Sequence, residues 1–224
     1  PSASAAAAVD TVDAPLEVHF IDVGQALSVL VECDGQFMLY DGGNVDDGSL
    51  VVSYLQKQGV EQLQYVFCSH AHEDHVGGLA AVMAKFPAGH AYSPVTESST
   101  KCFNDFVKYT QQQGLQLEVP SVGMVWPLGS ATVTLLGPVT GYSDTNNTSL
   151  VLRIDYGDTS FLLTGDMEKT AETDPVQMVS DIFLILSSPT PPTVFRTNIS
   201  HPPLLHSPNA TTRLSSTLLM PLPA

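Results

Sequence analysis

The chain has 224 residues, 43% of them hydrophobic, and a mean hydropathy of +0.11, values that allow one globular domain with a sizeable core. Lys and Arg number 8 against 23 Asp and Glu, so the formal net charge is -15 and the protein as a whole should repel polyanions such as long nucleic acids. No apolar run reaches the roughly 18 residues that a transmembrane helix needs, and an odd number of cysteines, three, argues against a disulfide framework and predicts buried free thiols.

The first fifteen residues, PSASAAAAVDTVDAP, are small and rich in Ala and Ser. This composition is typical of a spacer left after a secretory or lipoprotein signal has been removed. We therefore expect a flexible linker over residues 1–15 and an exported protein, extracellular or at the cell surface.

Residues 16–43 predict a β-meander. LEVHFIDVG and LSVLVECDG are short runs of branched and aromatic residues, and the second ends in Asp34-Gly35, a hairpin signal before QFMLYDGG. SLVVSYLQKQG, residues 49–59, has the apolar spacing of a helix, and LQYVFC, residues 63–68, follows as a buried strand.

The middle of the chain alternates in the same way. Helical spacing predicts helices over residues 76–86 and 100–114. Turn residues then separate four expected strands, LQLEV, ATVTLLG, SLVLRIDYG and TSFLLTGD. This order of elements predicts an α+β fold with two packed sheets and helices outside them.

The composition changes abruptly near the C-terminus. After Asp181 the chain contains no Asp or Glu and holds eight of the sixteen prolines. Beyond a possible strand at residues 182–186 the sequence predicts no regular structure, because Pro removes backbone donors. We expect one domain over residues 16–186 and an atypical Pro/Ser/Thr-rich tail over 187–224, which is either a flexible appendage or a foreign, out-of-frame C-terminus.

The stretch CSHAHEDHVGG, residues 68–78, crowds three of the seven histidines and two carboxylates into six positions. In an extended segment that leaves a strand, side chains two residues apart point the same way, so His70 and His72 can share one cation. Asp74 and His75 follow at the start of the next helix and can reach a second one. Imidazole and carboxylate ligands together suit Zn²⁺, Mn²⁺ or Fe, and two cations about 3.5–4 Å apart can hold a hydroxide between them.

SHAHEDHVGG resembles the His-X-His-X-Asp-His signature of the metallo-β-lactamase fold. Two further stretches narrow this resemblance, FIDVGQALSVLVECDGQFMLYDGG before the cluster and TNNTSLVLRIDYGDTSFLLTGDME after it. In this order they are similar to the metallo-β-lactamase-like domain of the ComEC competence proteins. The resemblance implies a four-layer αβ/βα sandwich with an incomplete or atypical C-terminal part, and two divalent metal ions, zinc or manganese, at one edge between the sheets.

The resemblance also assigns roles to individual residues. The expected metal ligands are His70, His72, Asp74, His75 and Asp166; Asp74 is also the expected catalytic residue, and Asp166 matches the carboxylate that bridges the two metals. Supporting roles fall to Asp41, which orients ligands without binding metal, and to Asn147 and Ser149, which stand where many members of the fold have another histidine.

The chain departs from the family pattern at two places. The ComEC-like GQGDS is GQALS here, at residues 24–28, which puts substrate specificity in doubt. A later HHGS-type segment that supplies the last histidine ligand is missing, and the only downstream histidines are His201 and His206, both beside proline. A site with one ligand fewer would retain a single cation.

The expected function is a metal-dependent hydrolase in which a metal-bound hydroxide attacks a phosphodiester bond, as in a ComEC-like nuclease or phosphodiesterase. Because basic residues are sparse, a short single strand or nucleotide suits this chain better than long duplex DNA. Two alternatives stay open. A hydrolase of the same fold could act on an ester, thioester or lactam, and a chain without the last histidine could be a non-catalytic remnant.

Overall fold

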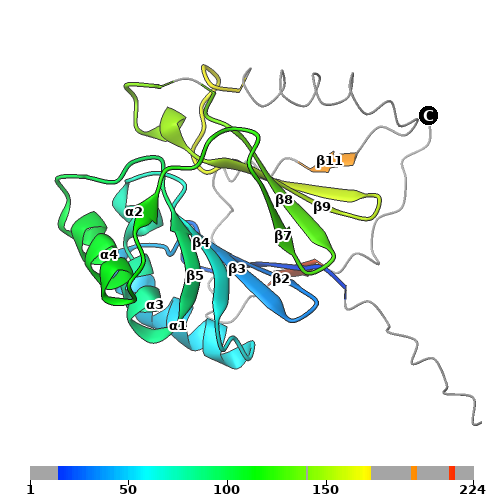
Figure 1. The fold of residues 1–224 in the computed structure, drawn as a ribbon, viewed down its shortest axis with the longest axis horizontal. Coiled ribbons are helices and arrows are strands. Elements are labelled where there is room, and N and C mark those ends of the chain that lie inside the picture. Colours follow the sequence, from blue (N-terminus) through cyan, green and yellow to red (C-terminus); the bar gives the residue numbers. More distant parts are fainter. Residues whose placement is uncertain (1–14, 140, 173–192, 196–211, 215–224) are drawn as a thin grey trace, which may run out of the picture.

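The computed structural model describes residues 15–139, 141–172, 193–195 and 212–214 (Figure 1). One sheet has seven strands in the order β12-β1-β2-β3-β4-β5-β6. Their bounds are β1 (Glu17–Phe20), β2 (Val29–Cys33), β3 (Gln36–Tyr40), β4 (Leu63–Phe67), β5 (Ala88–Tyr92), β6 (Leu117–Glu118) and β12 (Thr212–Leu214). The antiparallel meander β1-β2-β3 is confirmed, whereas β3 to β6 run parallel to one another.

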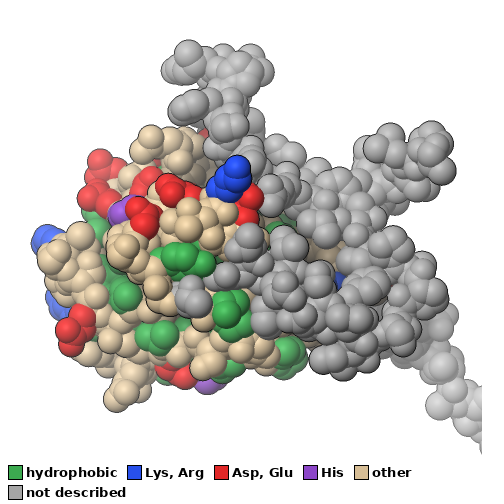
Figure 2. Space-filling view, turned by 90° about the horizontal axis from the view of Figure 1, so that it is seen from above, with side chains coloured by type: hydrophobic (Ala, Val, Ile, Leu, Met, Phe, Trp, Pro, Cys, Tyr) green, Lys and Arg blue, Asp and Glu red, His purple; other side chains and the backbone are tan. Residues whose placement is uncertain are grey.

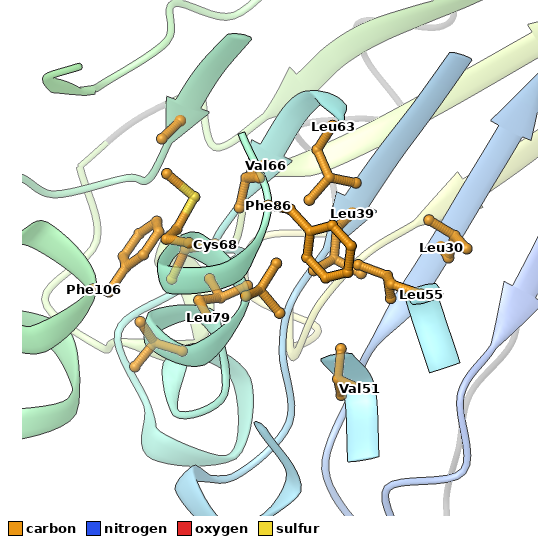
Figure 3. Close-up of a cluster of buried hydrophobic side chains, with 14 of the residues drawn as sticks. Leu30, Leu39, Val51, Leu55, Leu63, Val66, Cys68, Leu79, Phe86 and Phe106 are labelled. Carbon is orange, nitrogen blue, oxygen red and sulfur yellow. The ribbon is translucent and has the colours of Figure 1, made fainter. Parts of the chain in front are cut away.

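Helices connect the parallel strands and cover one face of this sheet (Figure 1). They are α1 (Gly48–Lys57), α2 (Glu73–Val76), α3 (Leu79–Lys85) and α4 (Lys101–Gln112), with short 3₁₀ turns at η1 (Val45–Asp47) and η2 (Asn146–Thr148). Parallel strands need crossovers of this kind. Leu39 and Val66 of the sheet pack with Leu55 and Phe86 of the helical side in a dry cluster (Figure 3).

The second sheet has the order β11-β10-β9-β8-β7. Its strands are β7 (Val125–Leu128), β8 (Ala131–Gly137), β9 (Val151–Tyr156), β10 (Thr159–Leu163) and β11 (Thr193–Phe195). Because strand side chains alternate between faces, Met38 and Tyr40 point away from the helices and join Trp126 and Leu152 in a core between the sheets. The predicted α+β class with two packed sheets is confirmed. The described residues supply three of the four expected layers.

Several local expectations differ from the structure. The helix expected over residues 76–86 is broken at Gly77-Gly78, where backbone from another loop approaches closely. β5, AGHAY, lacks a run of branched residues and gains its order by pairing with β4. The expected strand at 182–186 lies outside the described residues.

Two short strands lie in the tail, where the sequence predicted no regular structure. β11 pairs in parallel with β10, and β12 pairs antiparallel with β1, so each occupies an edge of a sheet. An edge strand offers unpaired backbone groups, so pairing there depends on the existing sheet more than on local propensity.

Two whole-chain expectations can be compared with the described residues. The three cysteines are free and buried, as expected. None of the helices in the described ranges has the length and apolar character that crossing a bilayer requires.

A buried side-chain hydrogen bond links the two sheets near the site. The phenol of Tyr40, fully buried, donates to the carbonyl of Leu150 at 2.9 Å across 110 positions of sequence. We expect Tyr40→Phe to lower the free energy of unfolding by about 1–2 kcal/mol, because it leaves a buried carbonyl without its donor. Urea unfolding measures the change. Tyr109→Phe, on the helical side, is the control and should change the free energy of unfolding by less than about 0.5 kcal/mol. If both substitutions changed it equally, the stabilising role given to the Tyr40 hydrogen bond would be wrong.

Candidate metal centre

The ends of strands from both sheets converge on one place. Asp41 directly follows β3, Ser69 and His70 follow β4, and Asp166 follows β10 by way of Thr164-Gly165. The ends of β3 and β4 are the carboxyl ends of neighbouring parallel strands, which is where α/β sheets bind ligands. The second sheet contributes Asp166, which follows β10. Residues 41, 69, 70 and 166 are therefore brought together by the fold.

The imidazoles of the histidine cluster face one another. His70 Nε2 lies 3.0 Å from His72 Nδ1, and His75 Nε2 lies 3.3 Å from Asp166 Oδ1. One ligand atom each from His70, His75 and Asp166 falls within 4.8 Å of the others. His70 and His75 are buried, whereas the Asp166 side chain is 44% exposed, so the cluster opens to solvent on the Asp166 side.

Asp41 contacts the cluster through Ser69 and through the Nδ1 side of the His75 ring. Its carboxylate accepts the backbone N–H of Ser69 at 2.6 Å and the Ser69 hydroxyl at 2.6 Å, and it lies 2.7 Å from His75 Nδ1. Asp41 is fully buried and has a φ of +62°, in the left-handed region that few residues other than glycine adopt. Its expected supporting role agrees with this geometry, since it contacts the ring of His75 on the side away from Asp166.

The charges around the two buried histidines differ. Burial, together with the charge on neighbouring His75, lowers the pKa of His70 to about 4. Burial also disfavours a charge on His75, but the carboxylates of Asp41 and Asp166 outweigh it and raise the pKa of His75 to about 10. The hydrogen bond with His75 lowers the pKa of Asp166, although burial opposes it. A cation held by His75 Nε2 must therefore replace a proton there.

The segment before β9 closes one side of the site. The Ser149 hydroxyl donates to the carbonyl of Asn146 at 2.6 Å, accepts the Asp166 N–H at 3.2 Å and lies 3.4 Å from His70 Nδ1. The side-chain oxygen of Asn147 accepts the Glu168 N–H at 3.1 Å. Asn147 and Ser149 are both buried, and both fix the turn that carries Asp166.

The structure places Asp74 less centrally than the other expected ligands. It lies half-buried on α2, and its backbone carbonyl accepts the N–H of Leu27 at 3.1 Å. The three-residue group of His70, His75 and Asp166 does not include it. His72 is exposed and reaches that group through its contact with His70. His201 and His206 lie outside the described residues.

A cleft of about 590 Å³ opens beside the cluster. Its lining includes the ionisable side chains of His75, Asp166 and Glu168 together with apolar side chains from the 24–28 loop and the strand ends. The apolar lining consists of Phe20, Ala26, Leu27, Val29, Leu163 and Met167. Figure 2 shows acidic side chains gathered around a histidine on the described surface of one face, with few basic ones.

The donor set fits a divalent cation. Two imidazole nitrogens that bind one tetrahedral Zn²⁺ at about 2.1 Å lie roughly 3.4 Å apart, a few tenths of an ångström more than the 3.0 Å between His70 Nε2 and His72 Nδ1. Imidazole and carboxylate donors together suit Zn²⁺ and Mn²⁺. His70 and His72 could therefore share one ion without a large movement of either ring.

Two features of the site have little signal in the sequence. Ser69 contacts Asp41, His70 and His75, and its only signal in the sequence is its place directly before the cluster. The other feature is the pair Gly77 and Gly78, which falls inside the helix expected over residues 76–86. A Gly-Gly pair is typical of a turn, and here the backbone of residues 42–45 lies close to both glycines.

Comparison with known proteins places these features in a family. A profile described as the metallo-beta-lactamase superfamily matches residues 21–224. The uncharacterized protein YcaI of Escherichia coli is 32% identical over 162 residues, which is 70% of this chain and 19% of that protein.

Two relatives are competence proteins by name. Competence protein ComA of Neisseria gonorrhoeae is 30% identical over 67% of this chain, and ComE operon protein 3 of Bacillus subtilis is 24% identical over 74% of it. The chain spans only 20% and 24% of their respective lengths. The expected resemblance to the competence proteins is confirmed.

Proposed function

Because the chain belongs to the metallo-β-lactamase superfamily, a family of hydrolases, we propose that it is a metal-dependent nuclease or phosphodiesterase. The observation that carries this proposal is the convergence of ligand atoms of His70, His75 and Asp166 within 4.8 Å of one another, beside an open cleft that His75 and Asp166 line. The members of the superfamily typically bind divalent metals, and the donors present here suit such ions.

The proposed ligands divide between two cations. His70 and His72 would hold one, Asp74 and His75 would hold the other, and Asp166 would contribute to both; Asp74 is also the proposed catalytic carboxylate. When bound, the cations supply a water of lowered pKa and stabilise negative charge on the attacked group. Asp41 keeps the His75 ring in place, and Ser149 holds the turn that carries Asp166.

A short phosphodiester fits the cleft better than a long duplex. Glu168 and Asp166 line the cleft, so a chain of several phosphates would meet negative charge beyond the metal ions. The apolar side chains in the lining, Leu27 and Met167 among them, suit a base or another uncharged group beside the cleaved bond. We therefore favour a short single strand or a nucleotide as the substrate.

The named relatives suggest a biological setting. Competence protein ComA and ComE operon protein 3 point to DNA uptake, where a nuclease domain would meet incoming strands outside the cytoplasm. We accordingly propose an exported, extracellular or cell-surface location.

A substrate panel tests the proposal. The full chain is stripped with a chelator, reloaded with Zn²⁺ or Mn²⁺, and assayed on bis(4-nitrophenyl) phosphate, short single-stranded DNA, long duplex DNA and an aryl thioester. We expect metal-dependent hydrolysis of the first two and slower cleavage of the duplex. Asp166→Asn should lower the rate by at least about tenfold, whereas Asp158→Asn, in the exposed turn between β9 and β10, should not.

The other outcomes discriminate between the remaining functions. Hydrolysis of the thioester alone would replace the phosphodiesterase with a carbonyl hydrolase of the same fold. Metal binding without turnover of any substrate, or no metal binding at all, would favour a non-catalytic remnant.

A further inference from the structure

Ser69 lies between the supporting carboxylate of Asp41 and the proposed ligand His70. It is fully buried, directly after β4 and directly before His70. Its backbone N–H donates to Asp41 Oδ1 at 2.6 Å, and its carbonyl accepts the N–H of Leu150 at 2.9 Å. These bonds to both sheets fix the backbone, so the position of the hydroxyl is set by the fold.

The hydroxyl of Ser69 has one hydrogen to give and two lone pairs to receive. The carboxylate of Asp41 can only accept, and its Oδ2 lies 2.6 Å from Ser69 Oγ, so the hydrogen goes there. The contact of 3.0 Å between Ser69 Oγ and His70 Nδ1 must then have the imidazole as the donor. Nδ1 of His70 therefore carries the proton.

Ser149 leads to the same assignment by a separate route. Its hydroxyl hydrogen is directed to the carbonyl of Asn146 at 2.6 Å, so toward His70 Nδ1, 3.4 Å away, it too can only accept. Both serines near Nδ1 present lone pairs to it. The opposite nitrogen, Nε2, is left with a free lone pair, and it is Nε2 that faces His72.

We propose that Ser69 is a positioning residue that fixes the tautomer of His70, with Nδ1 protonated and Nε2 presented to a cation. Asp41 thereby acts on two ligands at once, directly on His75 and through the Ser69 hydroxyl on His70. This inference rests on the proposed role of His70 as a ligand.

Two measurements on the full chain test it, nitrogen-15 NMR of the imidazoles and Zn²⁺ affinity by competition with a chelating dye. The wild type should show one His70 tautomer, protonated at Nδ1. Ser69→Ala leaves His70 Nδ1 with only the longer, 3.4 Å contact to Ser149, so it should give a mixture of tautomers and weaken Zn²⁺ binding by about 10–100-fold. Ser69→Thr retains the hydroxyl and should restore both properties.

Ser93→Ala is the matched control, because Ser93 is also fully buried and follows the neighbouring strand β5. It should leave the His70 tautomer and the Zn²⁺ affinity unchanged. An unaltered tautomer in Ser69→Ala, or an equal loss in Ser93→Ala, would overturn the proposal. Neither readout depends on hydrolysis, so a chain that fixes the tautomer and binds Zn²⁺ but cleaves no phosphodiester would refute the proposed function alone.

Discussion

Replacing His70 by alanine is expected to remove at least one bound metal equivalent and to weaken Zn²⁺ binding by more than about a hundredfold, more than the loss of a supporting residue costs. His70 lies 3.0 Å from His72, and one of its ring nitrogens lies within 4.8 Å of ligand atoms of His75 and Asp166. The protein is purified without added metal and exchanged into buffer that contains neither metal nor chelator. Elemental mass spectrometry then counts the bound ions.

His90→Ala is the control for this experiment. The His90 side chain is 53% exposed on β5 and pairs with Glu118, away from the candidate metal centre. Its removal should leave the metal content unchanged. About two equivalents in the wild type, lost in His70→Ala only, would mean that the site is complete without the HHGS-type segment. One equivalent or none in the wild type would favour the remnant, and equal metal content in His70→Ala and wild type would exclude His70 as a ligand.

The parts of the site that the sequence predicts are those encoded within a few residues. His70, His72, Asp74 and His75 follow one another directly, so their spacing alone indicates metal binding. Asp166 comes from a strand of the other sheet, and only the resemblance to a known family connected it to the cluster. Local periodicity carries no information on which distant strand ends will meet.

Residues that act through geometry are harder to predict. Ser69 is one small polar residue after a strand, and its importance appears only when Asp41 is placed 2.6 Å from its hydroxyl. Asp74 shows a different case, since its place in the motif suggests a central role but the group of His70, His75 and Asp166 does not include it. Its side-chain direction depends on how α2 packs, which spacing does not determine.

Among the helices and strands too, those with a strong local pattern are predicted from the sequence and those that depend on distant pairing are not. The helices near residues 49–59 and 100–114 have strong apolar periodicity, and both lie within two residues of the expected ends. β11 and β12 have three residues each and pair with β10 and β1, so their order comes from the sheets they join. Short edge strands of this kind have no sequence signal of their own.

Gly78→Ala is expected to lower the free energy of unfolding by about 3 kcal/mol or more, because a Cβ at this position would overlap the backbone. An ideal Cβ would lie 2.0 Å from the carbonyl oxygen of Gly42 and 3.2 Å from the Cα of Gly48. The N–H of Gly78 also donates to the carbonyl of Gly43 at 3.1 Å. Neither neighbour is a flexible side chain, so the junction of α2 and α3 must move away from the loop that follows β3.

That movement should reach the metal centre, because the same loop begins with Asp41 and the displaced helix carries His75. Widening their contact of 2.7 Å would release the imidazole from its supporting carboxylate, so Gly78→Ala should bind Zn²⁺ more weakly even where it remains folded. Urea unfolding and dye competition measure the two effects. Gly141→Ala is the control, since a Cβ there has no atom within 4 Å, and it should change stability by less than about 0.5 kcal/mol. A Gly78→Ala protein as stable as the control would show that the two backbones can separate at little cost, and that the glycine pair is not what holds Asp41 against the histidines.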